Sequence, residues 1–349
     1  MKESRNGRSI GALSRAVLGV ILFLGLSACS AQVLDRGIPI RRSGVLSPGG
    51  PTVGTVYWKD DRQVLFIGAK PDVFAILPDG RRVLRSFLMQ WDTASGEVTT
   101  LAELGEHGGF CYYHGYIRYW YRKPSSPEAR GDTVFKAGLL GSEVEVAHTG
   151  SINRFSCREY DELEVKSKIG QGFWPLRETD GYWGAHQGSG RVETVLVRVE
   201  AGKRRETPLK IPYQPYFRWS EYAGSYVFRR LETQFSRTNT TGKMWLLRPD
   251  GVTTEFDIPA GPWFGGSAGY DITRRGVFMW SYALVKHGNG DAGGYLIEAG
   301  RSPKRFIEGL IYAYGISPNG CGIALSIGRG GASRESAEMV LVNVCGKGG

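Results

Sequence analysis

Apolar and polar positions alternate along most of the chain, in short stretches that end at glycine-containing turns, and no long amphipathic helical pattern follows residue 30. A period of two is the pattern of a half-buried β-strand. Glycine among polar neighbours is typical of the turns that separate strands. With 50 glycines and 41 aromatic residues (17 Tyr, 15 Phe and 9 Trp), the chain is predicted to be all-β.

One unit recurs along the chain: an apolar strand, a glycine-containing turn and a more polar strand. Its turn glycines are separated by 45, 61, 49, 49 and 46 residues. A period of this length predicts a repeat architecture. The instances are Met89–Glu97, Thr133–Gly141, Val195–Gly202, Met244–Gly251, Tyr295–Gly300 and Val340–Gly346.

A second unit lies between these hairpins and consists of an aromatic-containing strand, a polar turn and another apolar strand. Two hairpins per period make four antiparallel strands, which is the blade of a β-propeller. We therefore predict a six-bladed β-propeller of four-stranded antiparallel blades over residues 51–349, with a pair of β-sandwiches or a chain of small β-domains as the alternative. The instances of the second unit are Tyr57–Phe66, Cys111–Trp120, Phe173–Trp183, Tyr216–Phe228, Tyr270–Trp280 and Tyr314–Leu325.

The ends and irregular parts of the repeat give further expectations. The last period stops just past its turn, so its outermost strand has to come from elsewhere, and we expect the segment Gly37–Val45 to supply it and close the ring. Residues 150–172 exceed what the third period needs and are expected to form an insertion. In the first period, Pro71–Gly80 is either a long loop or part of a strand.

Some of the turns resemble those of a known group. Leu77–Leu84 and Ser317–Gly320 look like the S-P-D-G strand turns of WD-like and TolB-type (PD40-like) propellers, and Trp91-Asp92 with Ser95–Glu97 looks like their third-strand ending. The resemblance covers the chain after the N-terminal segment as architecture. It implies a fold and no particular activity.

The N-terminus has the order of residues found in a secretory signal. Basic residues, among them Arg8 and Arg15, precede an apolar stretch from Ala16 to Leu26. Eleven apolar residues are too few to cross a bilayer, which takes about 20, and no later window is long or apolar enough to serve as a span. Residues 1–28 are therefore predicted to be a signal peptide.

The apolar stretch ends in Leu26-Ser27-Ala28-Cys29, which resembles the lipobox of bacterial lipoproteins. The resemblance implies cleavage before Cys29 and acylation of its sulfur, so that lipid chains such as palmitate hold the protein on a bilayer. An ordinary signal peptide with a chance cysteine is the alternative. Ser30, in place of aspartate, favours an outer-membrane lipoprotein facing the periplasm if the source is Gram-negative. Residues 29–50 would then be the lipidated tether and the possible ring-closing strand.

The net charge and the sequence motifs limit the classes of partner that the protein is expected to bind. Without residues 1–28, the chain has 321 residues with 40 Lys+Arg and 33 Asp+Glu, a net charge of +7. That balance suits nearness to anionic lipid and is also ordinary for a solvated surface. Tyr116–Lys123 interleaves basic and aromatic residues as nucleic-acid platforms do, but export and strand-like alternation predict no nucleic-acid partner. The protein is expected to be a monomer.

After Cys29, four cysteines are left, and export permits disulfides. If the second-to-third-strand hairpin of the last blade is centred near residue 333, Cys321 and Cys345 lie directly opposite each other and can form a disulfide. Two buried free thiols are the alternative. Cys111 with Cys157 would be the second pair.

No motif indicates catalysis, a metal or a cofactor. The five histidines stand far from one another, and 287–294 lacks the ligands of a calcium loop. Catalytic residues, metal ligands and cofactors are therefore each predicted as none. Loops between second and third strands are the long ones, and they mark the expected working face: Lys70–Arg81, Lys123–Asp132, Leu231–Gly242, Leu284–Gly293 and Gly328–Ser336.

These observations favour a membrane-anchored binding or scaffold propeller that engages another envelope protein or a cell-wall or sugar polymer. The alternative is a propeller enzyme, a lyase or hydrolase acting on a saccharide or peptide, with one residue from each of several blades meeting at the channel mouth. Such a site would leave no motif in the sequence, because its residues come from different periods.

Overall fold

The computed structural model describes residues 38–47, 56–76, 80, 82–105, 108–113, 115–122, 133–146, 172–179, 192–200, 203–209, 216–230, 242–258, 267–282, 292–328 and 337–346. They contain strands and turns and no helix, so none of them forms a helix that could span a membrane. The all-β prediction is confirmed.

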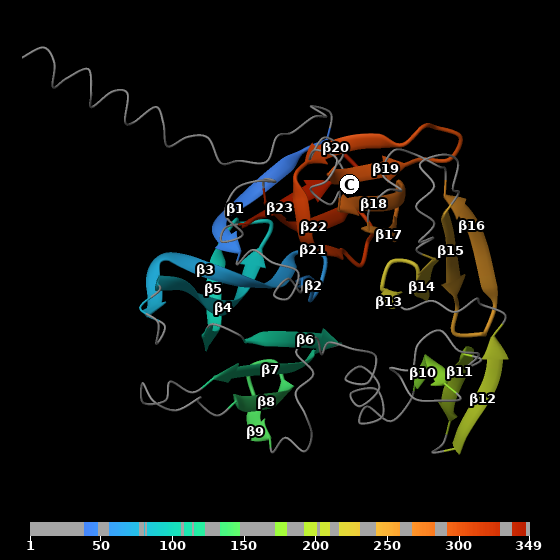
Figure 1. The fold of residues 1–349 in the computed structure, drawn as a ribbon, viewed down its shortest axis with the longest axis horizontal. Coiled ribbons are helices and arrows are strands. Elements are labelled where there is room, and N and C mark those ends of the chain that lie inside the picture. The colour runs from blue at the N-terminus through green and yellow to red at the C-terminus, as the bar shows by residue number, and fades with distance from the viewer. Residues whose placement is uncertain are drawn as a thin grey trace, which may run out of the picture.

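The strands form antiparallel meanders that stand around a common centre (Figure 1). The first contains β2 (Val56–Trp58), β3 (Gln63–Ile76), β4 (Arg82–Asp92) and β5 (Val98–Gly105). The second contains β6 (Gly109–Tyr113), β7 (Tyr116–Arg122), β8 (Thr133–Leu139) and β9 (Val144–Val146). A three-stranded sheet of β10 (Gly172–Thr179), β11 (Val192–Glu200) and β12 (Lys203–Leu209) follows along the chain.

The remaining meanders complete the circle seen in Figure 1. One contains β13 (Tyr216–Ser220), β14 (Ser225–Arg230), β15 (Gly242–Leu247) and β16 (Thr253–Ile258). The next contains β17 (Ser267–Thr273), β18 (Gly276–Tyr282), β19 (Gly293–Ile297) and β20 (Lys304–Glu308). The last contains β21 (Leu310–Ile316), β22 (Gly322–Gly328) and β23 (Ala337–Asn343), with β1 (Ile40–Ser47) beside β23. Antiparallel four-stranded sheets around a centre are the architecture of a β-propeller.

Strand position within a sheet explains the burial of its side chains. In β21, buried and half-buried residues alternate, whereas β22, a central strand with neighbouring sheets on both faces, is buried at six of seven positions. The outer strand β5 is exposed at four of its eight positions and buried at one. A central strand of a stacked sheet is apolar on both faces, and an outer strand needs one apolar face at most.

The repeat identified from the turn glycines is confirmed where the structure describes it. Gly96, Gly141, Gly251 and Gly300 lie in turns between third and fourth strands, and Gly346 follows β23 at the corresponding place. All five have φ between 70° and 92°, a left-handed conformation that only glycine adopts without strain. Gly202 lies outside the described residues.

Strand β1 completes the last sheet and ties it to the first. Ile40 pairs with Val342 and Ser47 with Ala337, so β1 runs antiparallel to β23. Leu46 also pairs with Ala69 of β3, which merges the first and last meanders into one sheet of eight strands. The structure thus places β1 where the segment Gly37–Val45 was expected to supply the missing strand.

Apolar clusters fill the spaces between neighbouring sheets. One lies between the first and second meanders around Leu65 and Phe110, another between the first and last around Trp91 and Met339. A third joins the last two meanders around Phe278. Burial of each sheet face against the next is what holds such a ring together.

The structure settles one alternative that the sequence left open, differs from one predicted strand pairing and leaves the long loops untested. Residues 70–76, expected either as loop or as strand, continue β3 past a bulge after Ala69, because Phe74 and Ile76 still pair with β4. Phe173 lies in β10 and pairs with Arg198 of β11, whereas the sequence prediction paired its strand through a turn at Gly181. The expected insertion at 150–172 and the other long second-to-third loops lie almost wholly outside the described residues.

Candidate functional site

The described residues line a cavity of about 210 Å³ near the centre of the ring, on the side where the innermost strands end. We call it the mouth cavity. It is lined at the ends of the innermost strands and at the turns that follow them, which gathers residues from every four-stranded meander. The lining residues are Tyr57, Trp58, Lys59, Tyr112, Tyr113, Trp219, Ser220, Glu221, Asp271, Ile316 and Pro318.

Aromatic rings form much of this lining because the repeat places an aromatic residue near the end of several innermost strands. Tyr57 at the end of β2 contacts Phe110 edge-on at 5.4 Å and Tyr112 at 6.4 Å between ring centroids. These contacts link the first and second meanders at the cavity wall. They fix the orientation of the Tyr57 and Tyr112 rings, since aromatic pairs prefer such tilted arrangements.

Trp219 forms the opposite wall and is also held by packing. Its indole meets the buried Tyr226 ring in a T-shaped contact at 5.1 Å. The next residue, Ser220, is buried, and its Oγ accepts a hydrogen bond from the Ala223 N–H, which closes the β13–β14 turn. This turn holds Glu221 at the cavity.

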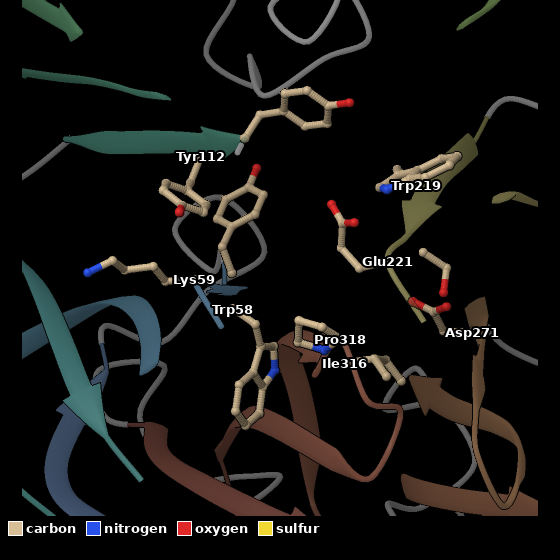
Figure 2. Close-up of a pocket in the computed structure, with 11 residues that line it drawn as sticks. Trp58, Lys59, Tyr112, Trp219, Glu221, Asp271, Ile316 and Pro318 are labelled. Atoms are coloured by element: carbon tan, nitrogen blue, oxygen red, sulfur yellow. The ribbon is translucent and has the colours of Figure 1, made fainter. Parts of the chain in front are cut away.

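Two carboxylates face the cavity. Figure 2 shows Glu221 projecting into the space between Tyr112 and Trp219, with the Asp271 carboxylate turned toward the same space. Asp271 is 2% exposed, and its Oδ1 accepts a hydrogen bond from the Ile272 N–H. The Lys59 amine points away from these groups (Figure 2).

Burial raises the pKa of Tyr112, and the negative charges of Asp60 and Glu221 raise it further. The Gly115 backbone hydrogen bond acts in the opposite direction without reversing the shift. The Tyr112 hydroxyl is therefore protonated at neutral pH and can donate a hydrogen bond. The aromatic rings can therefore stack against the apolar face of a ligand, and the two carboxylates can accept hydrogen bonds from donor groups at the edge of that ligand.

The base of the cavity depends on a close approach between β2 and β21. Trp58 is 8% exposed, and its Nε1 donates to the Gly315 carbonyl at 2.8 Å. A Cβ at Gly315 would lie 2.8 Å from the Val56 carbonyl oxygen, and one at Gly322 would lie 2.8 Å from the Trp58 ring. Both positions need glycine, because a side chain would collide with the Val56 backbone at Gly315 and with the tryptophan ring at Gly322.

A second, larger hollow of about 480 Å³ lies beside the mouth cavity, between the first and last meanders. We call it the closure groove. Two bonds cross it: Asn319 N–H donates to Asp61 Oδ1 at 2.8 Å, and Arg41 Nη1 donates to the Thr93 carbonyl at 2.8 Å. Cys321 and Pro39 also line it, so the groove lies where the two ends of the ring meet.

The structure joins Cys321 to Cys345 in a disulfide, with 5.2 Å between the Cα atoms. The predicted register needs a correction of one residue. Gly322 pairs with Asn343, so the residue opposite Cys321 is Val344, which donates its N–H to the Cys321 carbonyl. The Asn343 Oδ1 accepts from the Cys345 N–H and bends the chain after β23, which brings Cys345 to Cys321.

Most of the other candidate residues from the sequence lie outside the described part of the chain. Cys111 lies in β6, while its predicted partner Cys157 and the acylation candidate Cys29 lie outside the described residues, so both assignments stay predictions. The five histidines lie outside them too. Among the residues that the structure does describe, no group of three or more His, Cys, Asp or Glu could hold a metal ion.

The mouth cavity is on the face of the first-to-second-strand turns, whereas the sequence favoured the face of the long second-to-third loops. Tyr57, Trp58 and Trp219 entered the sequence analysis only as strand-forming residues of the repeat. Their recurrence at the ends of innermost strands was the available signal, because a closed ring brings equivalent positions of all blades to one centre.

No protein-family model matches the chain, and no curated protein sequence matches it. Solved structures do: a chain of the mitotic checkpoint complex is 10% identical, with a TM-score of 0.44 over 96% of this chain and 98% of that one. The β-propeller domain of the trilobed protease from Pyrococcus furiosus is 9% identical, with a TM-score of 0.37 over 86% and 93%. TolB from Acinetobacter baumannii is 12% identical, with a TM-score of 0.32 over 75% and 65%.

Proposed function

We propose that the protein is a lipid-anchored binding module of a bacterial envelope: a six-bladed β-propeller, exported by its signal peptide and held on a membrane through acylated Cys29. Residues 1–28 are the signal peptide, 29–50 the tether with the closing strand, and 51–349 the rest of the propeller. The outer membrane, on its periplasmic side, is the proposed location in a Gram-negative cell, and the protein acts as a monomer.

The described sheets support the proposed number of blades. Five meanders have four strands when β1 is counted with β21–β23, and β10–β12 supply three strands of one more. The chain between β9 and β10 and between β10 and β11 is long enough to hold the missing strand. A six-bladed ring buries both faces of each sheet, which an isolated four-stranded sheet cannot do.

The observation that carries the binding function is the mouth cavity, where aromatic rings and two carboxylates from separate blades meet. Apolar and aromatic walls with a few converging polar groups are typical of ligand sites. At about 210 Å³ it is smaller than the roughly 300–1,000 Å³ usual for whole ligands. It therefore suits one projecting group of a larger partner, such as a sugar unit of a polymer or a side chain of another envelope protein.

The test is chemical crosslinking and affinity capture of the lipidated protein from its own membrane, with Trp219→Ala as the site variant. Leu101→Ala is the matched control, because Leu101 is 41% exposed on β5, away from the cavity. We expect a specific protein or polymer to be recovered with the wild type and the control and lost with Trp219→Ala. Equal recovery with all three, or none with any, would refute the proposal.

Two further measurements test the membrane anchor and the enzyme alternative separately. Mass spectrometry of the mature N-terminus should find acylated Cys29, and an unmodified terminus would remove the anchor while leaving the binding site untouched. Turnover of a captured saccharide or peptide, lost in both Glu221→Gln and Asp271→Asn, would replace the binding module with the enzyme alternative.

A further inference from the structure

The N-terminal segment joins the ring on the same face as the mouth cavity. The Pro39 carbonyl accepts a hydrogen bond from the Asn343 N–H at the end of β23, and Pro39 and Arg41 line the closure groove with Thr93 and Asn319. Thr93 and Asn319 belong to turns that open toward the cavity. We call this side, formed by the first-to-second and third-to-fourth turns, the turn face.

The length of the tether favours one orientation of the ring over the other. Nine residues lead from Cys29 to Ile38, and at full extension they span roughly 30 Å. The seven residues of β23 already cover about 23 Å from the turn face to the opposite face. The tether leaves the ring at the turn face, so it would need most of its length to reach a membrane lying against the opposite face.

The opposite face is also unsuited to lie on a flat surface. Strand β3 has 14 residues, twice the length of β23, and with β4 it forms a hairpin that projects beyond the other strands on that side. The Arg82 guanidinium lies over the Phe74 ring at 4.2 Å and links the two arms of the hairpin. Ile76, near its end, is 75% exposed.

Exposed apolar residues are found on the turn face. Leu139 and Val144 flank the β8–β9 turn with exposures of 65% and 63%, and Val252 follows the β15–β16 turn with 51%. They are three of the five large apolar residues that are exposed among the described residues. Apolar side chains at the rim of a membrane-facing surface can enter the interface.

We infer that the turn face lies toward the membrane that carries the anchor, and that the mouth cavity binds a sugar ring of a glycolipid presented by that membrane. This inference rests on the proposed function, in particular on acylated Cys29. The Tyr112 and Trp219 rings provide faces on which a sugar ring stacks, and Glu221 and Asp271 accept hydrogen bonds from its hydroxyls.

Fluorescence energy transfer tests the orientation. The lipidated full-length protein, reconstituted in vesicles that contain an acceptor lipid, carries a donor dye on an azide-bearing residue at either Glu97 or Ile76. Glu97 is an exposed residue of the β4–β5 turn, and Ile76 marks the far end of the hairpin. We expect several-fold higher transfer from position 97, and equal or higher transfer from position 76 would overturn the orientation.

Vesicle cosedimentation tests the ligand. The probes are phosphatidylethanolamine–phosphatidylglycerol vesicles with and without a neutral glycolipid, monoglucosyl diacylglycerol, and the protein is the mature chain with Cys29→Ser, so that binding reports the cavity alone. We expect the glycolipid to raise the bound fraction several-fold, and Tyr112→Ala or Trp219→Ala to abolish that rise. Tyr121→Ala, which alters a half-buried tyrosine of β7 outside the cavity lining, should keep it.

The outcomes are distinguishable. Binding that is independent of the glycolipid, or an equal loss in Tyr121→Ala, would overturn the ligand assignment. Competition by delipidated saccharide, with no preference for the vesicles, would assign the cavity to a free polymer and leave the proposed binding function standing. Failure of the proposed anchor would be seen separately, as an unacylated N-terminus in mass spectrometry, and failure of the proposed binding function as equal affinity capture by the wild type and Trp219→Ala.

Discussion

Two junctions between neighbouring sheets are built differently. Between the fourth and fifth meanders in chain order, β13–β16 and β17–β20, the described contact is an apolar cluster around Met244, Tyr270 and Met279. Between the last and first meanders an apolar cluster around Trp91 is joined by the shared strand β1, by the Trp58–Gly315 hydrogen bond and by Asp61 with Asn319. The Cys321–Cys345 disulfide lies beside this junction, within the last sheet.

The difference follows from chain connectivity. Successive sheets elsewhere in the ring are joined by the polypeptide itself, which limits how far they can separate. At the closure the two sheets come from opposite ends of the chain, so only non-covalent contacts and the strand β1 hold them. Opening the ring there would expose apolar sheet faces and strand edges that invite aggregation, and the additional bonds at this junction oppose that opening.

Removal of the closing strand should have the largest effect. A mature chain that begins at residue 48 lacks buried Ile38 and the pairing of β1 with β23, and loss of one such buried side chain alone costs about 2–5 kcal/mol. We expect it to lose cooperative thermal unfolding, measured by circular dichroism. A chain that begins at residue 38 is the control and should unfold as the full mature protein does. Equal stability of the two would contradict closure by β1.

Loss of the disulfide should rank next. The double variant Cys321→Ser with Cys345→Ser opens a bridge between residues 24 apart in sequence, and the chain-entropy model assigns about 3 kcal/mol to a loop of that size. Urea titration of the wild type and the variant measures the free energy of unfolding. A loss below about 1 kcal/mol, no larger than that of a single hydrogen bond, would show that the bridge does not stabilise the fold.

A single hydrogen bond across the closure should matter less. Trp58→Phe removes the Nε1 donor and leaves the Gly315 carbonyl without that partner, at a cost of about 1–3 kcal/mol. Trp245→Phe is the matched control, because Trp245 is equally buried and its Nε1 donates within one sheet to the exposed Glu255 carboxylate. If the control lost as much stability as Trp58→Phe, the closure bond would have no special role.

The smallest effect is expected from pH. Hydrogen bonds and charge attraction from Arg275, and then Arg301, lower the pKa of Glu298, and Arg275 also donates to the Val344 carbonyl of the last sheet. A lowered folded-state pKa gives stability that is present above the unfolded pKa and is lost as pH falls through the folded value. Glu298→Gln should therefore flatten the loss of urea stability between about pH 6 and about pH 3, by less than about 1 kcal/mol. If Glu298→Gln left the pH dependence of the free energy of unfolding unchanged, the stabilising role of ionised Glu298 would be contradicted.

The sequence predicted the class of fold more accurately than the bounds and the register of individual strands. Glycine at third-to-fourth turns has a conformational cause, and positions such as Gly96 and Gly251 therefore marked the period correctly. The continuation of β3 through Phe74 could not be settled, because the turn residues Pro78 and Gly80 fit a loop and a long hairpin equally. The register at Cys321 was wrong by one residue, since hairpin length alone does not show where Asn343 bends the chain.

The site was largely invisible in the sequence. Trp219 and Asp271 are 52 residues apart and meet only because the ring brings the ends of their strands to one centre. Each of these residues has an ordinary strand context of its own. The sequence prediction favoured the other face because the length of its loops can be read from the sequence. The convergence of short turns at the mouth cavity depends on ring closure and cannot be read in that way.

A crystal structure of the acylated mature protein would test the central claim most directly. The expected result is six antiparallel sheets around one centre, with β1 beside β23 and the Tyr112 and Trp219 rings facing each other across the mouth cavity. Two stacked sheets, a different number of sheets, or a β1 that does not pair with β23 would contradict it.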